Sequence, residues 1–221
     1  MTVENGSRHE PEAIPPESAA AGVAGGTARK RGEKLLETVY DATKELIREE
    51  GYTALTFAKI ARRAHTSRTV LYSRWGTILT LVHDIMSYKS AQSLGGSLTD
   101  KLVDTGSLRG DFLHLLSLYV RIYRAVGPEV INAMLFEVSR NTDQVQELKD
   151  NVGLQNTESM ETILAFAQAR GDHVRAVSAM VQRLPFDLIR ICYMWGRTPL
   201  DRVDLEQIVD DILVPVFLQE N

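Results

Sequence analysis

Basic side chains gather in one short stretch of the sequence. Between Gly51 and Trp75 there are five lysines and arginines and no acidic residue. The wider stretch 29–75 has 11 basic and 6 acidic residues, a net +5, whereas the whole protein carries −4. A positive region on an acidic protein is typical of a surface that binds nucleic-acid phosphates. By charge alone, a solvated helix face is an equally good interpretation.

The elements that must position these charges are two short amphipathic helices between Thr56 and Trp75. Thr56 and Ser67 are residue types that commonly cap helix N-termini. The predicted inward positions are Phe57, Ile60, Ala61 and Ala64 in the first helix, and Val70, Leu71 and Trp75 in the second. Residues 65–66 are too few for more than a turn. The segment is therefore predicted to be a helix-turn-helix, whose second helix can enter the major groove of DNA.

The sequence before this motif divides into a tail and a helix. Residues 1–28 contain acidic residues, prolines and an Ala/Gly stretch with no apolar centre, so we expect a disordered tail and no signal peptide. After Arg31 an apolar stripe predicts a helix that ends at Gly51. The predicted domains are the tail at 1–28, a DNA-binding domain at 29–76 with its motif at 56–75, and a helical effector-binding and dimerisation domain at 77–221.

The remainder of the sequence predicts long amphipathic helices. A helix from Thr77 to the Gly95-Gly96 pair is followed by helices at about 108–126, 128–139, 143–169, 173–195 and 203–219. Pro185 and Pro215 are expected to kink the last two or to mark their edges. Since no segment alternates with period two for long enough to be a strand, the predicted fold class is all-α.

The motif and the helix before it, about residues 33–90, resemble the DNA-binding domain of the TetR family. The residues that carry the resemblance are Thr56, Ile60-Ala61, Ala64, Ser67 and Leu71-Tyr72, with the Tyr-x-Arg-Trp ending at Trp75. Beyond residue 90 the match is a general one, to a divergent helical ligand-binding and dimerisation domain. The resemblance implies a transcriptional regulator, by family habit a repressor, that a small ligand releases from a palindromic operator.

Three positions depart from the family's usual pattern. His65 stands in the turn where glycine is usual, and a positive φ there costs a non-glycine residue on the order of 1 kcal/mol. Val70 replaces a threonine in the recognition helix, and Ile78 replaces a basic residue at the start of the next helix. The last two replacements remove phosphate contacts, so DNA affinity is expected to be modest.

Eight polar residues are expected to bind DNA. Arg68 is suited to bidentate bonds with guanine O6 and N7, or else it faces phosphate or solvent. Tyr72 is expected to contact backbone or thymine, with simple packing as the alternative, and Trp75 is expected in the core. Base-edge contacts are assigned to Thr69 and Ser73, and phosphate contacts to Thr56, Thr66, Ser67 and Arg74. Arg29 to Arg31 either reach an adjacent groove or form a charged tail.

The C-terminal helices carry many aromatic side chains. The family resemblance implies an apolar effector pocket among them, although most aromatics at helical spacing are core residues. The residues assigned to this pocket for a small apolar effector are Phe112, Tyr119, Tyr123, Met134, Phe166, Phe186 and Tyr193. The last two helices resemble the family's four-helix dimer bundle, with intramolecular packing as the alternative, so a homodimer is expected.

An enzyme and a protein-binding adaptor are the rival functions. The histidines are scattered without metal-ligand spacing, Cys192 lies in an apolar stretch, and no glycine-rich phosphate loop follows a strand. Neither an enzyme, nor a metal, nor a cofactor is therefore expected. A helical adaptor without DNA binding stays as the alternative, against which the acid-free basic stretch argues. One cysteine and no apolar run of bilayer length favour a cytoplasmic protein with no membrane partner.

Overall fold

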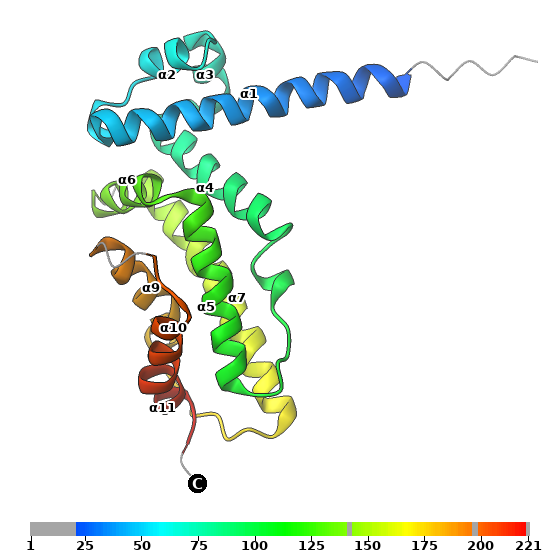
Figure 1. Ribbon diagram of the computed structural model, residues 1–221, viewed down its shortest axis with the longest axis vertical. Helices are drawn as coiled ribbons and strands as arrows, with labels where there is room; N and C mark the ends of the chain where they lie inside the picture. The colour runs from blue at the N-terminus through cyan, green and yellow to red at the C-terminus, as the bar shows by residue number, and fades with distance from the viewer. Residues whose placement is uncertain (1–20, 141–142, 196–198, 220–221) are drawn as a thin grey trace, which may run out of the picture. The chain divides into compact units, whose positions relative to one another are not determined.

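The computed structural model describes residues 21–140, 143–195 and 199–219 (Figure 1). Helices and short helical turns make up its regular structure, which confirms the all-α prediction. The elements are α1 (Ala21–Glu50), η1 (Tyr52–Ala54), α2 (Phe57–Arg63), α3 (Arg68–Trp75), α4 (Ile78–Leu94), η2 (Thr99–Lys101), α5 (Leu108–Val126), α6 (Pro128–Ser139), α7 (Asp143–Arg170), α8 (Ala179–Gln182), α9 (Leu184–Met194), α10 (Arg202–Ile208), η3 (Val209–Leu213) and α11 (Val214–Phe217). Within the described ranges, no helix is long and apolar enough to cross a membrane.

The chain divides within α1 into a unit that ends at Thr38 and a unit that begins at Val39. The second unit holds the helix-turn-helix and every later element. Helix α1 begins at Ala21, earlier than predicted, and takes in residues 21–28 of the expected tail. Residues 1–20 of the predicted tail lie outside the described residues.

From Val39 onwards helix α1 belongs to the second unit, and there its buried side follows the predicted stripe. Val39, Tyr40, Thr43, Leu46 and Ile47 are buried at helical spacing. The helix ends where expected, because Gly51 adopts a φ of 83° and donates its N–H to the carbonyl of Ile47 at 2.9 Å. This end fixes where the chain turns towards α2.

Helix α5 is the centre of the second unit. It packs against α4, α6, α7, α9 and α10. Its buried residues, which include Phe112, Leu115 and Leu116, follow one stripe of the helix. Gly127, with φ 94°, ends α5 and lets α6 start with Pro128 in its first turn. The predicted ranges 108–126 and 128–139 are confirmed, and α4 stops at Gly95 as predicted.

The expected single helix at 173–195 is wrong. Residues 173–175 are extended and pair with residues 217–219: the Arg175 N–H donates to the Phe217 carbonyl at 2.8 Å, and the Gln219 N–H donates to the His173 carbonyl at 2.9 Å. Helix α9 starts afresh, with Pro185 in its first turn, where its missing N–H costs no bond. Pro185 therefore marks a helix edge, one of the two outcomes expected of it.

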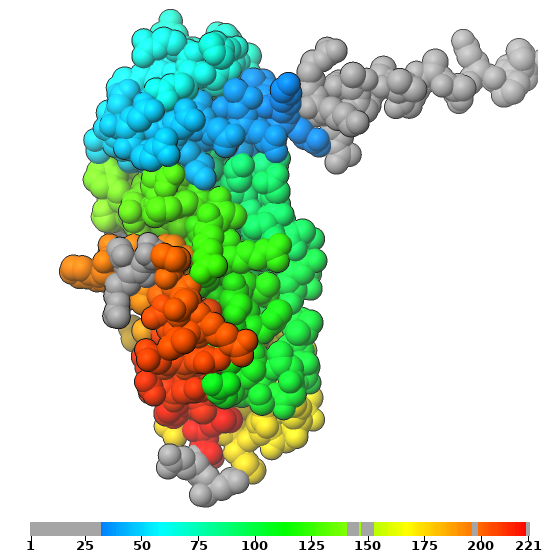
Figure 2. Space-filling view, viewed as in Figure 1, coloured from blue at the N-terminus to red at the C-terminus, as the bar shows by residue number. Residues whose placement is uncertain are grey.

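The predicted last helix is present as α10, η3 and α11 in succession. Its middle, Val209–Leu213, is a π-helical turn that precedes Pro215. Proline cannot donate the backbone bond of a regular helix, and a wider turn is one way to accommodate it. Leu205, Val209, Leu213 and Phe217 are buried along one side of this segment. Figure 2 shows the α9 to α11 region, in orange to red, at the surface of the second unit.

Candidate nucleic-acid interface

Helix α2 is held by its cap and by three buried residues. The Thr56 hydroxyl accepts a hydrogen bond from the backbone N–H of Lys59 at 3.3 Å, as its capping role predicts. Phe57, Ile60 and Ala61 are buried. The polar face of α2 is consequently the face that stays exposed.

The turn between α2 and α3 has the geometry expected of a glycine, although its residue is His65. The φ of His65 is 52°, and it is the one positive φ of a non-glycine residue in the described part of the chain. The Thr66 N–H donates back to the Ala61 carbonyl at 2.9 Å, which is the bond that closes a Schellman helix end. The predicted positive φ is confirmed, and this closed turn sets the angle between the two helices.

Helix α3 has two buried side chains. Ser67 caps it by accepting from the Val70 N–H at 3.2 Å, and Leu71 and Trp75 are buried. The prediction that Val70 faces inward is wrong, because 42% of Val70 is exposed. In an eight-residue helix the pair Leu71 and Trp75, four positions apart, defines the inner side, and Val70 lies about 100° from Leu71 around the axis. Trp75 is in the core, as predicted.

The structure brings the eight expected DNA-binding residues together around α3. Half-buried Thr66 lies in the turn before it. The remaining seven are exposed: Thr56, Ser67, Arg68, Thr69, Tyr72, Ser73 and Arg74. Since hydroxyls and guanidinium groups donate to phosphate and base oxygens, this surface has the chemistry for DNA contact.

Two of these residues also pack on neighbouring rings. The Tyr72 ring meets Phe57 edge to face, with centroids 4.6 Å apart, and yet 58% of Tyr72 is exposed. The Arg74 guanidinium lies 5.3 Å from the centroid of the Trp75 ring. In this one conformation Tyr72 packs on Phe57 and still exposes enough of its side chain to contact DNA.

Two of the five basic residues are paired with acids of α1. The Lys59 ammonium lies 2.6 Å from Glu50, and Arg63 pairs with Glu45 at 3.1 Å and with Glu49 at 2.7 Å. Sequence reasoning missed this pairing because the acids precede Gly51. Glu45 and Glu49 are four residues apart on one helix face, which was the available signal. The positive charge of the candidate interface thus comes from the remaining arginines, 62, 68 and 74.

The start of α4 follows the recognition helix directly. Thr77 caps α4 by accepting from the Thr80 N–H at 3.1 Å, as predicted. Ile78 is the first helical residue and is half-buried, so it is neither a core residue nor fully exposed. A basic residue at this position would lie beside the recognition helix.

A polar junction beneath α3 was not predicted from the sequence. The Tyr40 hydroxyl and the Trp75 indole N–H both donate to Oδ2 of Asp84, at 2.7 Å and 2.8 Å. Burial, followed by the bond and charge of Asp84, raises the pKa of Tyr40, which therefore stays protonated as a donor. The available signal was an acid next to the apolar residues Leu81, Val82 and Ile85 of α4.

The residues assigned to an effector pocket lie in the interior of the C-terminal helices. Tyr119 contacts Tyr123 and Phe186, and Tyr123 contacts Tyr193, with ring centroids 4.6 to 5.2 Å apart. Phe112 packs on Phe217 instead. Met134 is buried on α6, and Phe166 is half-buried on α7. The buried Tyr193 hydroxyl has no hydrogen-bond partner in the described structure.

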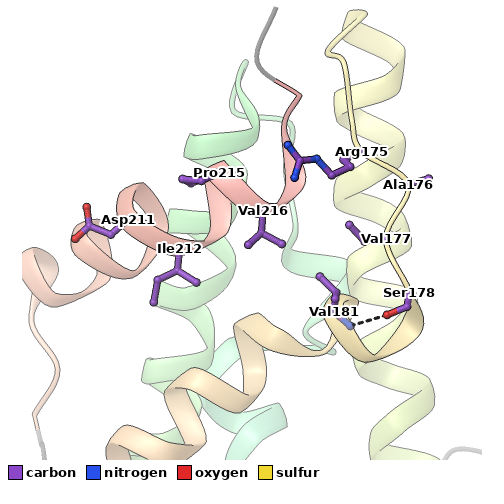
Figure 3. A pocket seen from close by; sticks show the side chains of 9 residues that line it. All are labelled: Arg175, Ala176, Val177, Ser178, Val181, Asp211, Ile212, Pro215 and Val216. Atoms are coloured by element: carbon purple, nitrogen blue, oxygen red, sulfur yellow. Dashed lines mark hydrogen bonds between the residues drawn. The ribbon is translucent and has the colours of Figure 1, made fainter.

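A cavity of about 500 Å³ opens elsewhere, between the segment before α8 and the end of the chain (Figure 3). Arg175, Val177 and Val181 lie on one side, and Ile212 and Val216 lie on the other. None of the seven predicted pocket residues lines it. Its lining residues fall within 173–195 and 203–219, the two segments whose sequence resembles the family's dimer bundle.

The sequence matches two protein-family models. Residues 39–85 match the model described as "Bacterial regulatory proteins, tetR family". Residues 102–212 match "Tetracyclin repressor-like, C-terminal domain". Together the matches include α2, α3 and most of the helices around α5.

Whole-chain relatives agree with these matches. The chain is 22% identical to the "DNA-binding transcriptional repressor TetR" of Mycobacteroides abscessus over 83% of this chain and 94% of that protein. It is 30% identical to an uncharacterized HTH-type transcriptional regulator of Mycobacterium bovis over 78% of this chain and 83% of the relative.

Solved structures show the same fold. A bacterial regulatory protein in the tetR family from Rhodococcus RHA1 has a TM-score of 0.65 at 16% identity, covering 85% of this chain and 99% of that one. The SmeT–triclosan complex has a TM-score of 0.60 at 17% identity, covering 85% and 93%. The chain belongs to the TetR family, and it is a DNA-binding transcriptional regulator rather than an enzyme.

Proposed function

We propose that this regulator is a repressor that binds a near-palindromic operator as a homodimer and is released from it by a small ligand. The observation that supports it best is the division of α3 into two faces. Leu71 and Trp75 hold the inner face, while the outer face presents Arg68, Thr69 and Ser73. A helix held on one side and polar on the other is suited to the major groove.

The proposed roles follow from side-chain chemistry. Arg68 lies in the first turn of α3 and is assigned bidentate contact with a guanine. Thr69, Tyr72 and Ser73 are assigned to base edges or thymine methyls. Phosphate contact is assigned to Thr56, Thr66, Ser67 and Arg74.

The proposed dimer surface is the outer side of α9. Leu184, Leu188, Ile191 and Trp195 are spaced to form a row opposite buried Phe186, Ile189 and Tyr193. Of this row, 53% of Ile191 and 79% of Trp195 are exposed. A helix that is apolar on both sides is normally covered on both. A second copy of the chain, related by a two-fold axis, is the simplest cover and gives two recognition helices for one palindrome.

The proposed effector is a small, mostly apolar molecule that binds among Tyr119, Tyr123, Phe186 and Tyr193. These rings fill the space between them in the described conformation, so a ligand must separate them. Burial raises the pKa of Tyr123 and of Tyr193, so both hydroxyls stay neutral. The ligand acts only through a higher affinity for the form that does not fit the operator. That SmeT, of similar fold, was solved with triclosan supports a small ligand.

We also propose that residues 29–76 form the DNA-binding domain and residues 77–221 the effector-binding and dimerisation domain. The two family matches, 39–85 and 102–212, support two functional parts, and the first match extends past residue 76 into α4. A role in operator binding supports the cytoplasmic location that is part of this proposal.

Selection of bound sequences from a random DNA library tests this proposal. The purified full chain is expected to enrich an inverted repeat, and a transcription assay on a promoter that overlaps that repeat is expected to give less transcript. Increased transcript would identify an activator. If no sequence is enriched and no DNA is shifted even at low salt, the alternative of a protein-binding adaptor is favoured.

A further inference from the structure

Asp84 of α4 joins three helices through one carboxylate oxygen. Its Oδ2 accepts the Tyr40 hydroxyl of α1 at 2.7 Å and the Trp75 indole N–H of α3 at 2.8 Å. Tyr40 and Trp75 are nearly fully buried, and Asp84 is half-buried. The two aromatic rings also lie near each other, with centroids 6.3 Å apart and an interplanar angle of 58°.

The junction consists of a half-buried carboxylate that accepts hydrogen bonds from two aromatic side chains. Leu81, Val82 and Ile85 surround Asp84 in sequence, and all three are buried. A carboxylate in such surroundings loses hydration, and hydrogen bonds to the charged form compensate for that loss. Among the described residues its bonded partners are two stiff aromatic donors instead of a lysine or arginine. Two bonds to one oxygen fix direction as well as distance.

The junction connects the recognition helix to the rest of the second unit. Trp75 is the last residue of α3, and the next helix, α4, packs on α5 and α6. Leu71, the other buried residue of α3, has an apolar side chain that offers no hydrogen bond and so gives little directional control. The Trp75–Asp84 bond is therefore the directional contact between the end of α3 and α4.

We propose that Asp84 is a positioning residue for operator recognition: it sets the orientation of α3, and hence base contact, without itself touching DNA. This proposal rests on α3 being the DNA-reading helix. Phosphate contacts tolerate a small rotation of α3 because charge attraction has little angular dependence, whereas bidentate base contacts do not. Loss of the junction must therefore reduce operator binding more than binding to random DNA.

The test compares Asp84→Asn, Trp75→Phe and Tyr40→Phe in the full chain, on the selected operator and on random DNA. The asparagine has nearly the same shape but lacks the charge, and each phenylalanine removes one donor and keeps a ring. For Asp84→Asn and Trp75→Phe we expect about tenfold weaker operator binding, the equivalent of one hydrogen bond to a charged group. Random-DNA affinity, the salt slope and the dimer are expected to change little.

Thr43→Val is the matched control, because it removes a buried hydroxyl whose bond goes to Val39 within α1. It alters a buried side chain of α1 without touching the junction, so its ratio of operator to random affinity is expected to stay that of the wild type. Equal losses on both DNAs, unchanged operator affinity in Trp75→Phe, or the same ratio change in Thr43→Val would each overturn the proposal. If Asp84→Asn does not fold, Trp75→Phe decides. A wild-type protein that selects no operator contradicts the proposed function instead.

Discussion

Arg63 of α2 and Glu49 of α1 form a two-point ion pair, with Nη1 to Oε1 at 3.1 Å and Nη2 to Oε2 at 2.7 Å. Glu45 accepts a further bond from Arg63. The hydrogen bonds from Arg63 lower the pKa of the Glu49 carboxyl. Arg63 thus fastens α2 to α1, and its charge is offset before DNA arrives. Arg63 is therefore expected to contribute less to DNA binding than Arg68, which lies exposed on α3.

Arg68→Ala is predicted to weaken the selected operator by about 1–3 kcal/mol while barely changing affinity for random DNA. The reason is that a guanine contact is lost and phosphate contacts remain. Fluorescence anisotropy on both DNAs measures the two affinities. Equal losses would mean that Arg68 touches only phosphate.

The control is the double variant Glu49→Gln with Arg63→Gln, which removes one charge of each sign. Its dependence of log affinity on log salt is predicted to equal that of the wild type. A slope shallower by about 0.9 would mean that Arg63 contacts a phosphate after all.

His65 is predicted to cost the protein stability through its backbone. Replacement by glycine at φ 52° relieves a left-handed conformation, so His65→Gly is expected to raise the free energy of unfolding by up to about 1 kcal/mol. His65→Val is expected to lower it, because a β-branched residue fits that conformation poorly. Urea denaturation measures both. A less stable glycine variant would show that the imidazole itself contributes to folding.

The helix-turn-helix was predictable because its signals are local. Thr56, Ser67 and Thr77 each cap the helix that follows, and the positive φ of His65 follows from its place in the turn. Val70 was placed wrongly because three apolar residues in an eight-residue helix do not fix a phase, whereas contact with the rest of the fold does.

The C-terminal part was less predictable because its contacts are distant in sequence. Helical periodicity over 173–195 gave no sign that residues 173–175 pair with 217–219, because Val174 and its partner Leu218 are 44 residues apart. In the N-terminal part, the pairs of Asp84 with Tyr40 and of Arg63 with Glu45 were missed for the same reason: the partners lie on different helices. Spacing along one helix predicts which side is buried, but not which polar groups meet across helices.

Ile191→Asp is predicted to convert the dimer into monomers and to abolish binding to the full palindrome. A charge in the outer apolar row of α9 would be buried without a partner in the interface, while the monomer fold keeps it exposed. Val103→Asp is the matched control, since Val103 and Ile191 are each 53% exposed and Val103 lies outside that row. Sedimentation velocity measures the assembly. A dimeric Ile191→Asp, or a monomeric Val103→Asp, would place the interface elsewhere.

Ile78→Lys is predicted to tighten DNA binding at low salt. Ile78 begins α4 directly beyond the Thr77 cap, next to the recognition helix, and its branched side chain offers no hydrogen bond to a phosphate. A lysine there adds one phosphate contact, which steepens the slope of log affinity against log salt by about 0.9. Preferred sequence is expected to stay the same, because phosphate contacts carry no base information. Since Ile78 is only half-buried, the melting temperature is expected to change little. A large fall in melting temperature without a gain in affinity would mean that the side chain belongs to the core and that the first turn of α4 does not approach the DNA backbone.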